Sequence, residues 1–475
     1  MSVQNTHPQY NNNLPKWTKC RNSIEGEVKG YVPRLADQSN DEYKAYIERP
    51  SFFNATSRTL DALVGLIHSK EAEINIPSQI ALMAENITLD DDTLEDFAKN
   101  LTIEALAVGR VGVLVDMPSV DRSQYTQAQA EALNLRPYAR MYKAESIINW
   151  YSVNVNGVNK LSMVVLKEIY EADTADEFTK EEKIRYRVLD LYDGFYRQRI
   201  FQEVNKAYVA VSEVLPMANG LRLDYIPFIF IGASSLKSSC DKPPLLDLVE
   251  VNISHFKNEV DLEAGCHTAA LPFIVIKGYQ AQPNEVLKVG SNTIFTLADP
   301  HADAKFVEFH GTGLGTLEVR TAVKEKRMAV LGARLLLDEK KTAEATETVA
   351  MRSSGERSVL MSVALTISSG ITKMLQIMAE WENVSGDIVY NLNTDYNLNT
   401  MDAQLLAQLM AGVQGGTTPL SVLFYNMQQG ELIEEGMDFE AFQAGIETAP
   451  PTLSVTNEKK TDTSLMTSIR SKLGI

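Results

Sequence analysis

Apolar residues recur at helical spacing in the first part of the chain. Leu60, Leu63, Val64 and Ile67 are separated by one, three or four positions and fall on one helix face. The segment "LDDDTLEDFAKNLTIEALAVG" predicts a second helix, whose acidic first turn suits the helix dipole. The segment "RVGVLVDMP" is short, apolar and rich in β-branched residues, so it predicts a buried strand.

Residues 138–232 predict a β-rich region. Four segments have the length and composition of strands, several of them with alternating apolar positions and with turn residues between them: "LSMVVLKEIYEA", "KIRYRVLDLYDG", "FYRQRIFQEV" and "IPFIFIGA". We therefore expect a sheet here, between two mainly helical regions.

The second half of the chain predicts helices around a small β-rich piece. Pro243 and Pro244 suit the first turn of a helix that runs to about Gly265. Strand-like segments follow at roughly 270–311, then a helix from about Thr316 to Leu337 and a long helix that ends near Trp381. A short strand, "GDIVYNL", precedes two or three helices between 400 and 448, one of them beginning at Thr418-Pro419. The predicted fold class is α+β.

Both ends of the chain are polar. Residues 1–40 contain Pro8, Pro15 and Pro33, and we expect a loose N-terminal arm there. Residues 449–475 are rich in Pro and Thr, and we expect a flexible tail. The N-terminal segment has no basic stretch followed by an apolar one, so it does not predict a signal peptide.

A charged connector, "DEKKTAEATET" at 338–348, joins two strongly helical segments. It has no large apolar side chain, and therefore nothing to contribute to a core. Since it also lacks Gly and Pro, a continuous helix is the alternative prediction for the same residues.

Composition restricts the partners and the compartment. The chain has 475 residues, which favours two or more domains, and it is 44% hydrophobic, enough to build a core. Its net charge of -17 means that any contact with DNA must be local or weak, because phosphate binding depends on Lys and Arg. The three cysteines show no disulfide framework, and no run of 18 apolar residues predicts a membrane span.

Several motifs approach known chemistry without completing it. The strand that ends in Asp116 is similar to the second motif of P-loop ATPases, but the dipeptide Gly-Lys, which the phosphate loop requires, is missing from the chain. The glycines of "FVEFHGTGLGT" lack the third position of a dinucleotide fingerprint, where Thr316 stands. The segment "LDDDTLED" lacks the glycine of a calcium loop, and His267 beside Cys266 predicts packing rather than a metal site. We expect no enzyme, no cofactor and no metal.

One region is locally basic. Residues 316–341 contain seven basic side chains and four acidic ones, a formal charge of +3: Arg320, Lys324, Lys326, Arg327, Arg334, Lys340 and Lys341 against Glu318, Glu325, Asp338 and Glu339. A positively charged surface that meets DNA is one interpretation. An ordinary solvated helix face with pairs at i, i+3 and i, i+4 is the other.

The order of these blocks resembles the portal proteins of tailed bacteriophages, and most closely a portal-like subgroup catalogued only as a conserved phage domain of unknown function. Four segments carry the resemblance: "YKAYIERPSFFNATSRTLDALVGLIHSKEAEINIP", "LAVGRVGVLVDMP", "LLDLVEVNISHFKNEVDLEAGCHTAALPFIVIKG" and "LLLDEKKTAEATETVAMRSSGERSVLMSVALTISSGITKMLQIMAEW". Together they span about residues 43–381. None is a catalytic signature, so the specificity lies in their order.

The resemblance implies a division of the chain into the parts of a portal subunit. After the arm, these parts are a wing at 41–241, a first stem helix at 242–268, a clip at 269–315, a second stem helix at 316–337, a tunnel loop at 338–348, a long helix with the rest of the wing at 349–399 and crown helices at 400–448.

It also implies a ring, usually of twelve identical subunits, at one vertex of a virion capsid assembled in the host cytoplasm. Double-stranded DNA would pass through the ring without sequence specificity. The other implied partners are the terminase, the major capsid protein and scaffold, and head-completion, adaptor or tail proteins, with no membrane. The residues expected to face DNA are Lys340, Lys341, Thr342, Glu344 and Thr346 of the loop and Lys324, Lys326, Arg327 and Arg334 of the stem. Another capsid-associated structural protein, such as an adaptor or minor head protein, is the alternative, and a packaging nuclease or ATPase is the third.

Overall fold

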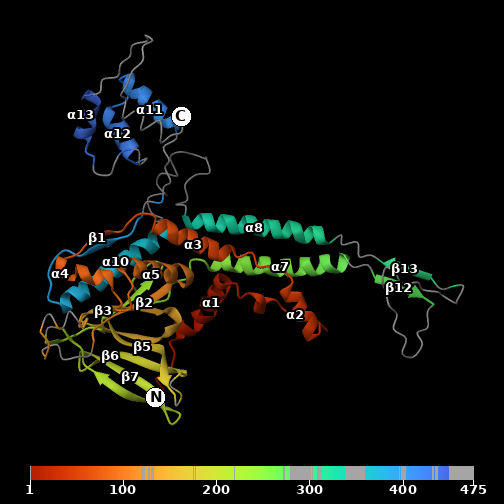
Figure 1. The fold of residues 1–475 in the computed structure, drawn as a ribbon, viewed down its shortest axis with the longest axis horizontal. Helices are drawn as coiled ribbons and strands as arrows, with labels where there is room; N and C mark the ends of the chain where they lie inside the picture. Colours follow the sequence, from red (N-terminus) through yellow and green to blue (C-terminus); the bar gives the residue numbers. More distant parts are fainter. Residues whose placement is uncertain are drawn as a thin grey trace. The chain divides into compact units, whose positions relative to one another are not determined.

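The computed structural model describes residues 2–118, 124–126, 129, 133–174, 176, 178–218, 220–270, 273–278, 301, 303–307, 313–336, 359–394, 396, 403–429, 433 and 437–448. The chain divides into two compact units, Met1–Thr394 and Asp395–Ile475. Each unit has its own elements, and Figure 1 shows the ribbon of both. The expected tunnel loop at 338–348 lies outside the described residues, as do most of the expected clip and the tail.

The first unit begins with helices. Their bounds are α1 (Pro8–Glu25), η1 (Lys29–Tyr31), α2 (Asn40–Glu48), α3 (Ala55–Ile67), α4 (Ser78–Ala81), η2 (Leu82–Glu85) and α5 (Leu94–Val108). Local signals begin and end them: the Asp96 backbone N–H donates to Thr93 Oγ1 at the start of α5, and Gly109 ends that helix with a φ of 71°.

The expected loose arm at residues 1–40 is wrong, because α1 is a packed helix. Pro8 stands at the first turn, where no hydrogen bond is lost, and Gln9 N donates to His7 Nδ1 at 3.1 Å. Trp17 and Cys20 of α1 are both 0% exposed. The His7 ring also stacks on Trp150, with ring centroids 4.0 Å apart, so the start of the chain is fixed against the sheets.

Two antiparallel sheets follow. The first has the order β11–β2–β3, formed by β11 (Phe228–Gly232), β2 (Arg110–Asp116) and β3 (Tyr138–Lys143); the second is a meander, formed by β4 (Ile147–Val155), β5 (Val158–Asp173), β6 (Lys180–Tyr192), β7 (Phe195–Val204) and β8 (Ala207–Val214). The short elements beside them are η4 (Ala144–Ser146), β9 (Met217–Ala218) and β10 (Leu221–Arg222). Every residue of β2 and β11 is buried, as the apolar sequence predicted. The hairpin turns Asn156-Gly157 and Asp193-Gly194 have positive φ at both positions, which suits the twist of the strands.

An ion network joins the two sheets. Glu168 of β5 accepts hydrogen bonds from Arg187 Nε at 2.7 Å, Arg185 Nε at 2.7 Å and the Tyr142 hydroxyl at 2.6 Å. Arg187 also lies 3.3 Å from Asp116 at the end of β2. Because these groups, apart from the half-buried Arg185, are buried and mutually paired, the network holds β3 and β2 against β5 and β6.

The rest of the first unit contains three long helices. They are α7 (Leu246–Ala270), α8 (Leu314–Leu336) and α10 (Val359–Trp381), with the hairpin of β12 (Phe273–Lys277) and β13 (Asp303–Val307) between the first two. After α10, β14 (Val389–Asn391) pairs with β1 (Glu73–Asn75). The second unit contains α11 (Ala403–Gln414), α12 (Leu420–Gln429) and α13 (Phe439–Thr448), packed around Phe424 and Phe442. The predicted class, α+β, is confirmed.

The helix α10 is the centre of the core. By length and composition alone it is apolar enough to cross a membrane, although it does not consist of 18 consecutive apolar residues. However, its most apolar window is 61% buried within the chain, and residues on several of its sides are covered, among them Leu360, Ile371, Met374 and Trp381. Gly370 lies so close to β11 that a Cβ there would be 2.6 Å from Ile231 Cδ1. This burial is that of a core helix.

Candidate functional site

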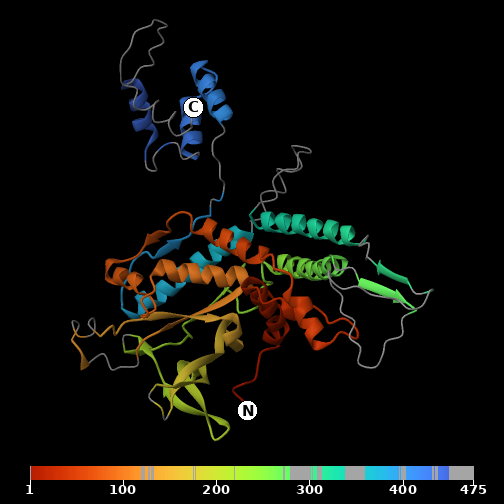
Figure 2. The same cartoon turned by 45° about the vertical axis from the view of Figure 1, so that its right-hand side comes forward.

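The candidate site is the helix pair α7 and α8 with the hairpin β12–β13. Figures 1 and 2 show the two helices side by side, reaching away from the sheets toward the hairpin. The hairpin is antiparallel, with Phe273 opposite Val307 and Lys277 opposite Asp303. The pair was predicted as two stem helices, and the hairpin as two strands of the expected clip.

A buried polar cluster, Ser23–Thr56–Asn252, anchors α7 to the body. All three residues are 0% exposed. Asn252 Oδ1 accepts from the backbone nitrogen and from the hydroxyl of Thr56, both at 3.0 Å, and its amide nitrogen donates to the Phe53 carbonyl at 2.9 Å. The Ser23 and Thr56 hydroxyls lie 3.0 Å apart. The cluster therefore joins α1, α3 and α7 with satisfied hydrogen bonds.

The burial of α7 ends partway along the helix. Its buried residues are Leu248, Val249, Asn252, Ile253, His255, Phe256 and Val260. None of the ten residues from Asp261 to Ala270 is buried. In this distal part Gly265 faces Leu314 of α8. A Cβ added at residue 265 would be only 2.4 Å from Leu314 Cδ2, so the two helices approach closely here. Beyond Val260 the helix is therefore only partly covered: the Tyr46 hydroxyl of α2 donates to Asp261, and the turns that follow continue beside α8.

Polar contacts cross between the two helices. Lys324 Nζ of α8 donates to the Ser254 carbonyl of α7 at 2.6 Å. His255 is 2% exposed, and its Nε2 lies 3.4 Å from Glu325 Oε1. Met328, one turn further along α8 and 4% exposed, lines a hollow together with Thr59 and Leu63 of α3. These contacts fix which face of α8 is turned toward α7.

A basic stripe, Arg320–Lys324–Arg327, follows one side of α8. The three residues are spaced at i, i+4 and i+7, so they fall on one helix face. Burial, and then the positive charges of Arg320, Arg327 and Lys257, lower the pKa of Lys324. The stripe is thus a locally positive surface in a chain of charge -17.

The residues predicted to face DNA have different positions. Lys324 and Arg327 belong to the basic stripe, although the ammonium of Lys324 is used between the helices. Lys326 is two residues from Lys324, about 200° around the helix, and therefore lies on another face. Arg334 is in the last turn of α8, and its side chain lies outside the described part. Lys340, Lys341, Thr342, Glu344 and Thr346 are beyond the described residues.

A stripe of exposed valines, Val319–Val323–Val330, was missed at the sequence level. These side chains are 63%, 42% and 51% exposed. Their spacing of four and seven residues places them on one face of α8, beside Lys326. That spacing was the available signal, but periodicity alone does not show whether an apolar face is covered within the chain.

The carboxylate of the strand similar to an ATPase motif, Asp116, belongs to the buried ion network. Asp116 is 6% exposed, and its Oδ2 lies within 3.4 Å of Arg187, Gln198 and Tyr138. Cys266 and His267 are exposed near the end of α7. Within the described ranges, no group of three His, Cys, Asp or Glu side chains is arranged to hold a metal ion.

Comparison with known proteins gives one family match. Residues 244–382, from the start of α7 to the end of α10, match the family described as domain of unknown function DUF4055. The match covers the helix pair and the core helix but less than half of the chain. No curated protein shows significant similarity to the sequence.

Solved structures of gene transfer agent (GTA) particles contain similar chains. A chain in the virion of the native GTA particle has 12% identity and a TM-score of 0.37, over 83% of this chain and 94% of that one. A chain in the neck of the empty GTA particle computed with C6 symmetry has 12% identity and a TM-score of 0.39 (81% and 92%). A chain in the neck of the native GTA particle computed with C12 symmetry has 14% identity and a TM-score of 0.39 (80% and 92%). At these values the similarity does not by itself establish a shared fold or function.

Proposed function

We propose that this chain is a portal subunit of a tailed phage or phage-like particle, and that copies of it form a ring-shaped channel for DNA. The observation that carries the proposal is the helix pair α7–α8, in which the burial of α7 ends at Val260 and which leads to a separate β hairpin. The distal part of the pair is little buried within one chain, since none of the α7 residues from Asp261 to Ala270 is buried. It is therefore suited to packing beside the equivalent pairs of neighbouring copies.

The two stripes on α8 differ in chemistry, so the helix pair has one apolar side and one positively charged side. Val319–Val323–Val330 offers an apolar side, which a neighbouring copy would cover. Arg320 and Arg327, which flank the interhelical Lys324, offer a positive side, which would face the channel and meet phosphates. Because a channel must let DNA move, a few cations against a net charge of -17 suit transient contact better than a wholly basic surface would.

The remaining assignments follow the order of the chain. The body before α7 would be the wing, and the β hairpin would belong to the clip that docks the terminase and later the head-completion or tail proteins. The connector 338–348 would be the tunnel loop, and the second unit the crown. Replacing residues 270–314 by a short linker should leave the body folded and abolish terminase binding; unchanged binding would contradict the docking assignment.

The decisive experiment is imaging of the purified full-length chain by negative-stain electron microscopy, with native mass measurement. The expected result is a closed ring with a central hole, close to the mass of twelve 52.8 kDa chains, formed without ATP or metal. A chain that stays monomeric at micromolar concentration would overturn the proposal. Association without a central hole would favour the alternative of an adaptor or minor head protein, and robust ATP hydrolysis would favour a packaging enzyme.

A further inference from the structure

The hairpin of β5 and β6 extends beyond the sheet to which it belongs. The two strands pair from Met163–Asp190 to Asp173–Lys180. The strand β4 pairs with β5 only as far as Leu166, and β7 pairs with β6 only from Arg185. Residues 169–184, here called the ribbon, therefore continue as two strands for about five residues, or roughly 17 Å.

The tip of the ribbon holds a phenylalanine in the open. Phe178 is 89% exposed. Its backbone nitrogen donates to Asp176 Oδ1 at 3.1 Å, and Thr179 Oγ1 donates to Asp176 Oδ2 at 2.7 Å. The Thr174 hydroxyl donates to the Thr179 carbonyl at 2.8 Å. These hydrogen bonds hold Phe178 with its ring in solvent, where covering it by another surface would be favourable.

The ribbon is also strongly acidic. It contains six carboxylates and two lysines, a formal charge of -4: Glu171, Asp173, Asp176, Glu177, Glu181 and Glu182 against Lys180 and Lys183. An exposed pair, Ile169 opposite Ile184, adds apolar surface at its base; these side chains are 63% and 38% exposed. A partner surface should therefore be positively charged and have an apolar floor.

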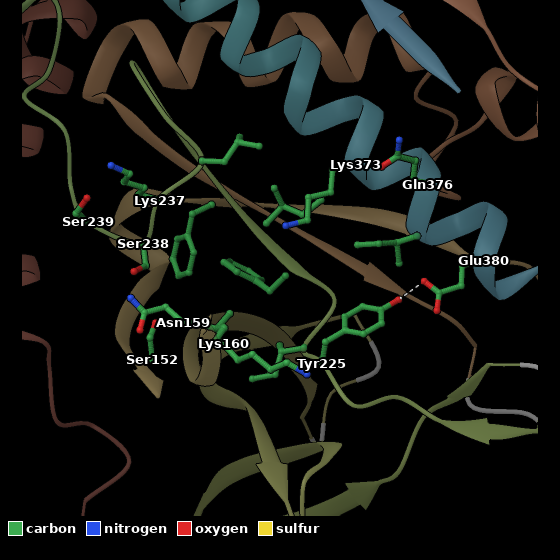
Figure 3. A pocket seen from close by; sticks show the side chains of 17 residues that line it. Ser152, Asn159, Lys160, Tyr225, Lys237, Ser238, Ser239, Lys373, Gln376 and Glu380 are labelled. Atoms are coloured by element: carbon green, nitrogen blue, oxygen red, sulfur yellow. Dashed lines mark hydrogen bonds between the residues drawn. The ribbon is translucent and has the colours of Figure 1, made fainter. Parts of the chain in front are cut away.

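Another part of the same chain has these properties. A pocket of about 820 Å³ lies between β11 and α10, and its floor includes Phe228, Phe230, Ile226 and Ile377. Three lysines and one glutamate line it: Lys160, Lys237, Lys373 and Glu380. Figure 3 shows Lys373 reaching into the pocket from α10, with Lys237 at another edge and Tyr225 bonded to Glu380.

Two of these lysines are available for a partner. Lys160 is paired with Asp224 at 2.8 Å. In the described part of the chain, neither Lys237 nor Lys373 has an ion-pair partner. The pocket therefore combines an apolar floor with free positive charge at its rim, the complement of the ribbon tip.

We infer that Phe178 of one copy inserts into this pocket of a neighbouring copy, with the carboxylates of the ribbon facing Lys237 and Lys373. Within one chain the ring is exposed and the pocket open, so the chain does not use one to cover the other. Because the two surfaces differ, the contact is head-to-tail, the kind that generates a ring or an open filament. The inference rests on the proposed function only in that both need copies of the chain to associate.

The contact can be located by cross-linking in the full-length chain. A Phe178→p-benzoylphenylalanine variant, mixed with isotope-labelled chain and irradiated, should attach between copies to pocket residues such as Ile226, Leu236 or Ile377. A Tyr192→p-benzoylphenylalanine variant is the matched control, because Tyr192 is an exposed aromatic residue at the opposite end of β6. Attachment from position 178 within its own chain, or at the same sites as from position 192, would overturn the inference.

Substitutions give an independent test through the association constant, measured by sedimentation velocity. Phe178→Ala should weaken association by about 10- to 100-fold, the range expected for losing one buried aromatic side chain. Lys237→Glu with Lys373→Glu should also weaken it, and Glu171→Lys with Glu182→Lys, a directly opposed pair on one face of the ribbon, should restore it. Lys44→Glu, the same charge change at an exposed site on α2, should have little effect. Failure of the restoring pair would count against the inference.

The outcomes separate this inference from the proposed function. Rings whose position-178 cross-links avoid the pocket would overturn the inference and leave the portal proposal standing. Pocket cross-links in open filaments would support the inference and contradict the ring. A chain that stays monomeric and gives no cross-link between copies would overturn both.

Discussion

The side-chain oxygen of Asn252 lies 3.0 Å from the backbone nitrogen of Thr56, so α7 is tied to the first turn of α3 by a contact with no access to water. Asn252→Ala would leave the Thr56 N–H and the Phe53 carbonyl without this partner. We expect the free energy of unfolding to fall by about 1–3 kcal/mol.

Urea denaturation followed by tryptophan fluorescence is a suitable measurement, because Trp17, Trp150 and Trp381 are all buried in the first unit. Asn13→Ala is the control. Its amide donates to the Gln9 carbonyl on an exposed side of α1, and the change should have an effect within about 0.5 kcal/mol. Equal effects of the two variants would contradict the anchoring role of Asn252.

A pair of glycine substitutions tests how closely α10 packs on β11. In Gly370→Ala the new methyl group would be 2.6 Å from Ile231 Cδ1, so we expect a destabilisation of about 1–3 kcal/mol. Gly65 lies in α3 with no neighbouring atom within 4 Å of a Cβ, and Gly65→Ala should stabilise the chain by about 0.4–1 kcal/mol. Thermal unfolding would show opposite changes in Tm; a rise with Gly370→Ala would mean that the packing there is loose.

The Glu168 carboxylate should make the first unit sensitive to acid. Burial by itself raises the pKa of Glu168, but Arg187 and hydrogen bonds from Arg187 and Tyr142 outweigh it and lower the pKa to about 2, against 4.5 without the fold. Since the folded value is the lower one, the stabilisation is complete above about pH 4.5 and is lost as the pH falls toward 2. The difference corresponds to about 3 kcal/mol.

Glu168→Gln should therefore destabilise the chain strongly at pH 7 and much less at pH 3, measured by urea denaturation. Asp116 acts in the opposite direction, because burial raises its pKa, so the comparison of variant with parent is more informative than the acid sensitivity of the parent alone. Glu182→Gln, at an exposed position, provides the control. A destabilisation by Glu168→Gln that is the same at both pH values would exclude this role of the carboxylate.

Association through the valine stripe of α8 predicts a defect of assembly without a defect of folding. Val323 is 42% exposed, so Val323→Glu should leave the Tm nearly unchanged. If a neighbouring copy covers the stripe, the buried charge should prevent closed rings at concentrations at which the parent forms them. Native mass spectrometry would detect the difference. Glu318→Gln, a change at an exposed position of α8, serves as control; rings formed normally by Val323→Glu would show that the stripe remains uncovered.

The basic stripe predicts a directional effect on DNA. Arg320→Gln and Arg327→Gln should each weaken binding of a short duplex and lower the slope of log affinity against log salt by about 0.9 for each phosphate that the variant no longer neutralises. Lys326→Gln lies on another face of α8 and should have a smaller effect. Fluorescence anisotropy over a salt series is the measurement. An equally weakened affinity in all three variants would mean that α8 does not present one defined face to DNA.

The fold was predictable from the sequence where the pattern was long and regular. The apolar stripe of α10 and the strands from β5 to β7 were visible because periods of 3.6 and 2 persisted over many residues. The helix α1 was missed because Pro8, Pro15 and a polar composition suggested a loose segment. The signal was the spacing of Tyr10, Trp17 and Cys20, which places three buried side chains on one face.

The candidate site was predictable in composition but not in orientation. The excess of basic residues in α8 could be counted, yet the hydrogen bond from Lys324 to the Ser254 carbonyl depends on which face of α8 meets α7. The two residues are 70 positions apart, and no local pattern records that pairing. The same limit applies to the valine stripe and to the pocket beside Lys373. Both are exposed only because no other part of the described chain packs on them, and a local sequence pattern does not record that.

The end of burial at Val260 has a mechanical consequence. A pulling force applied to the β12–β13 hairpin would act first on the turns of α7 and α8 beyond Asp261, where Tyr46 of α2 makes the last hydrogen bond to α7 that the described part of the chain contains. Those turns should separate at low force, while the Ser23–Thr56–Asn252 cluster and the core around α10 remain intact. The hairpin could therefore be displaced repeatedly by a moving partner without unfolding the body that carries it.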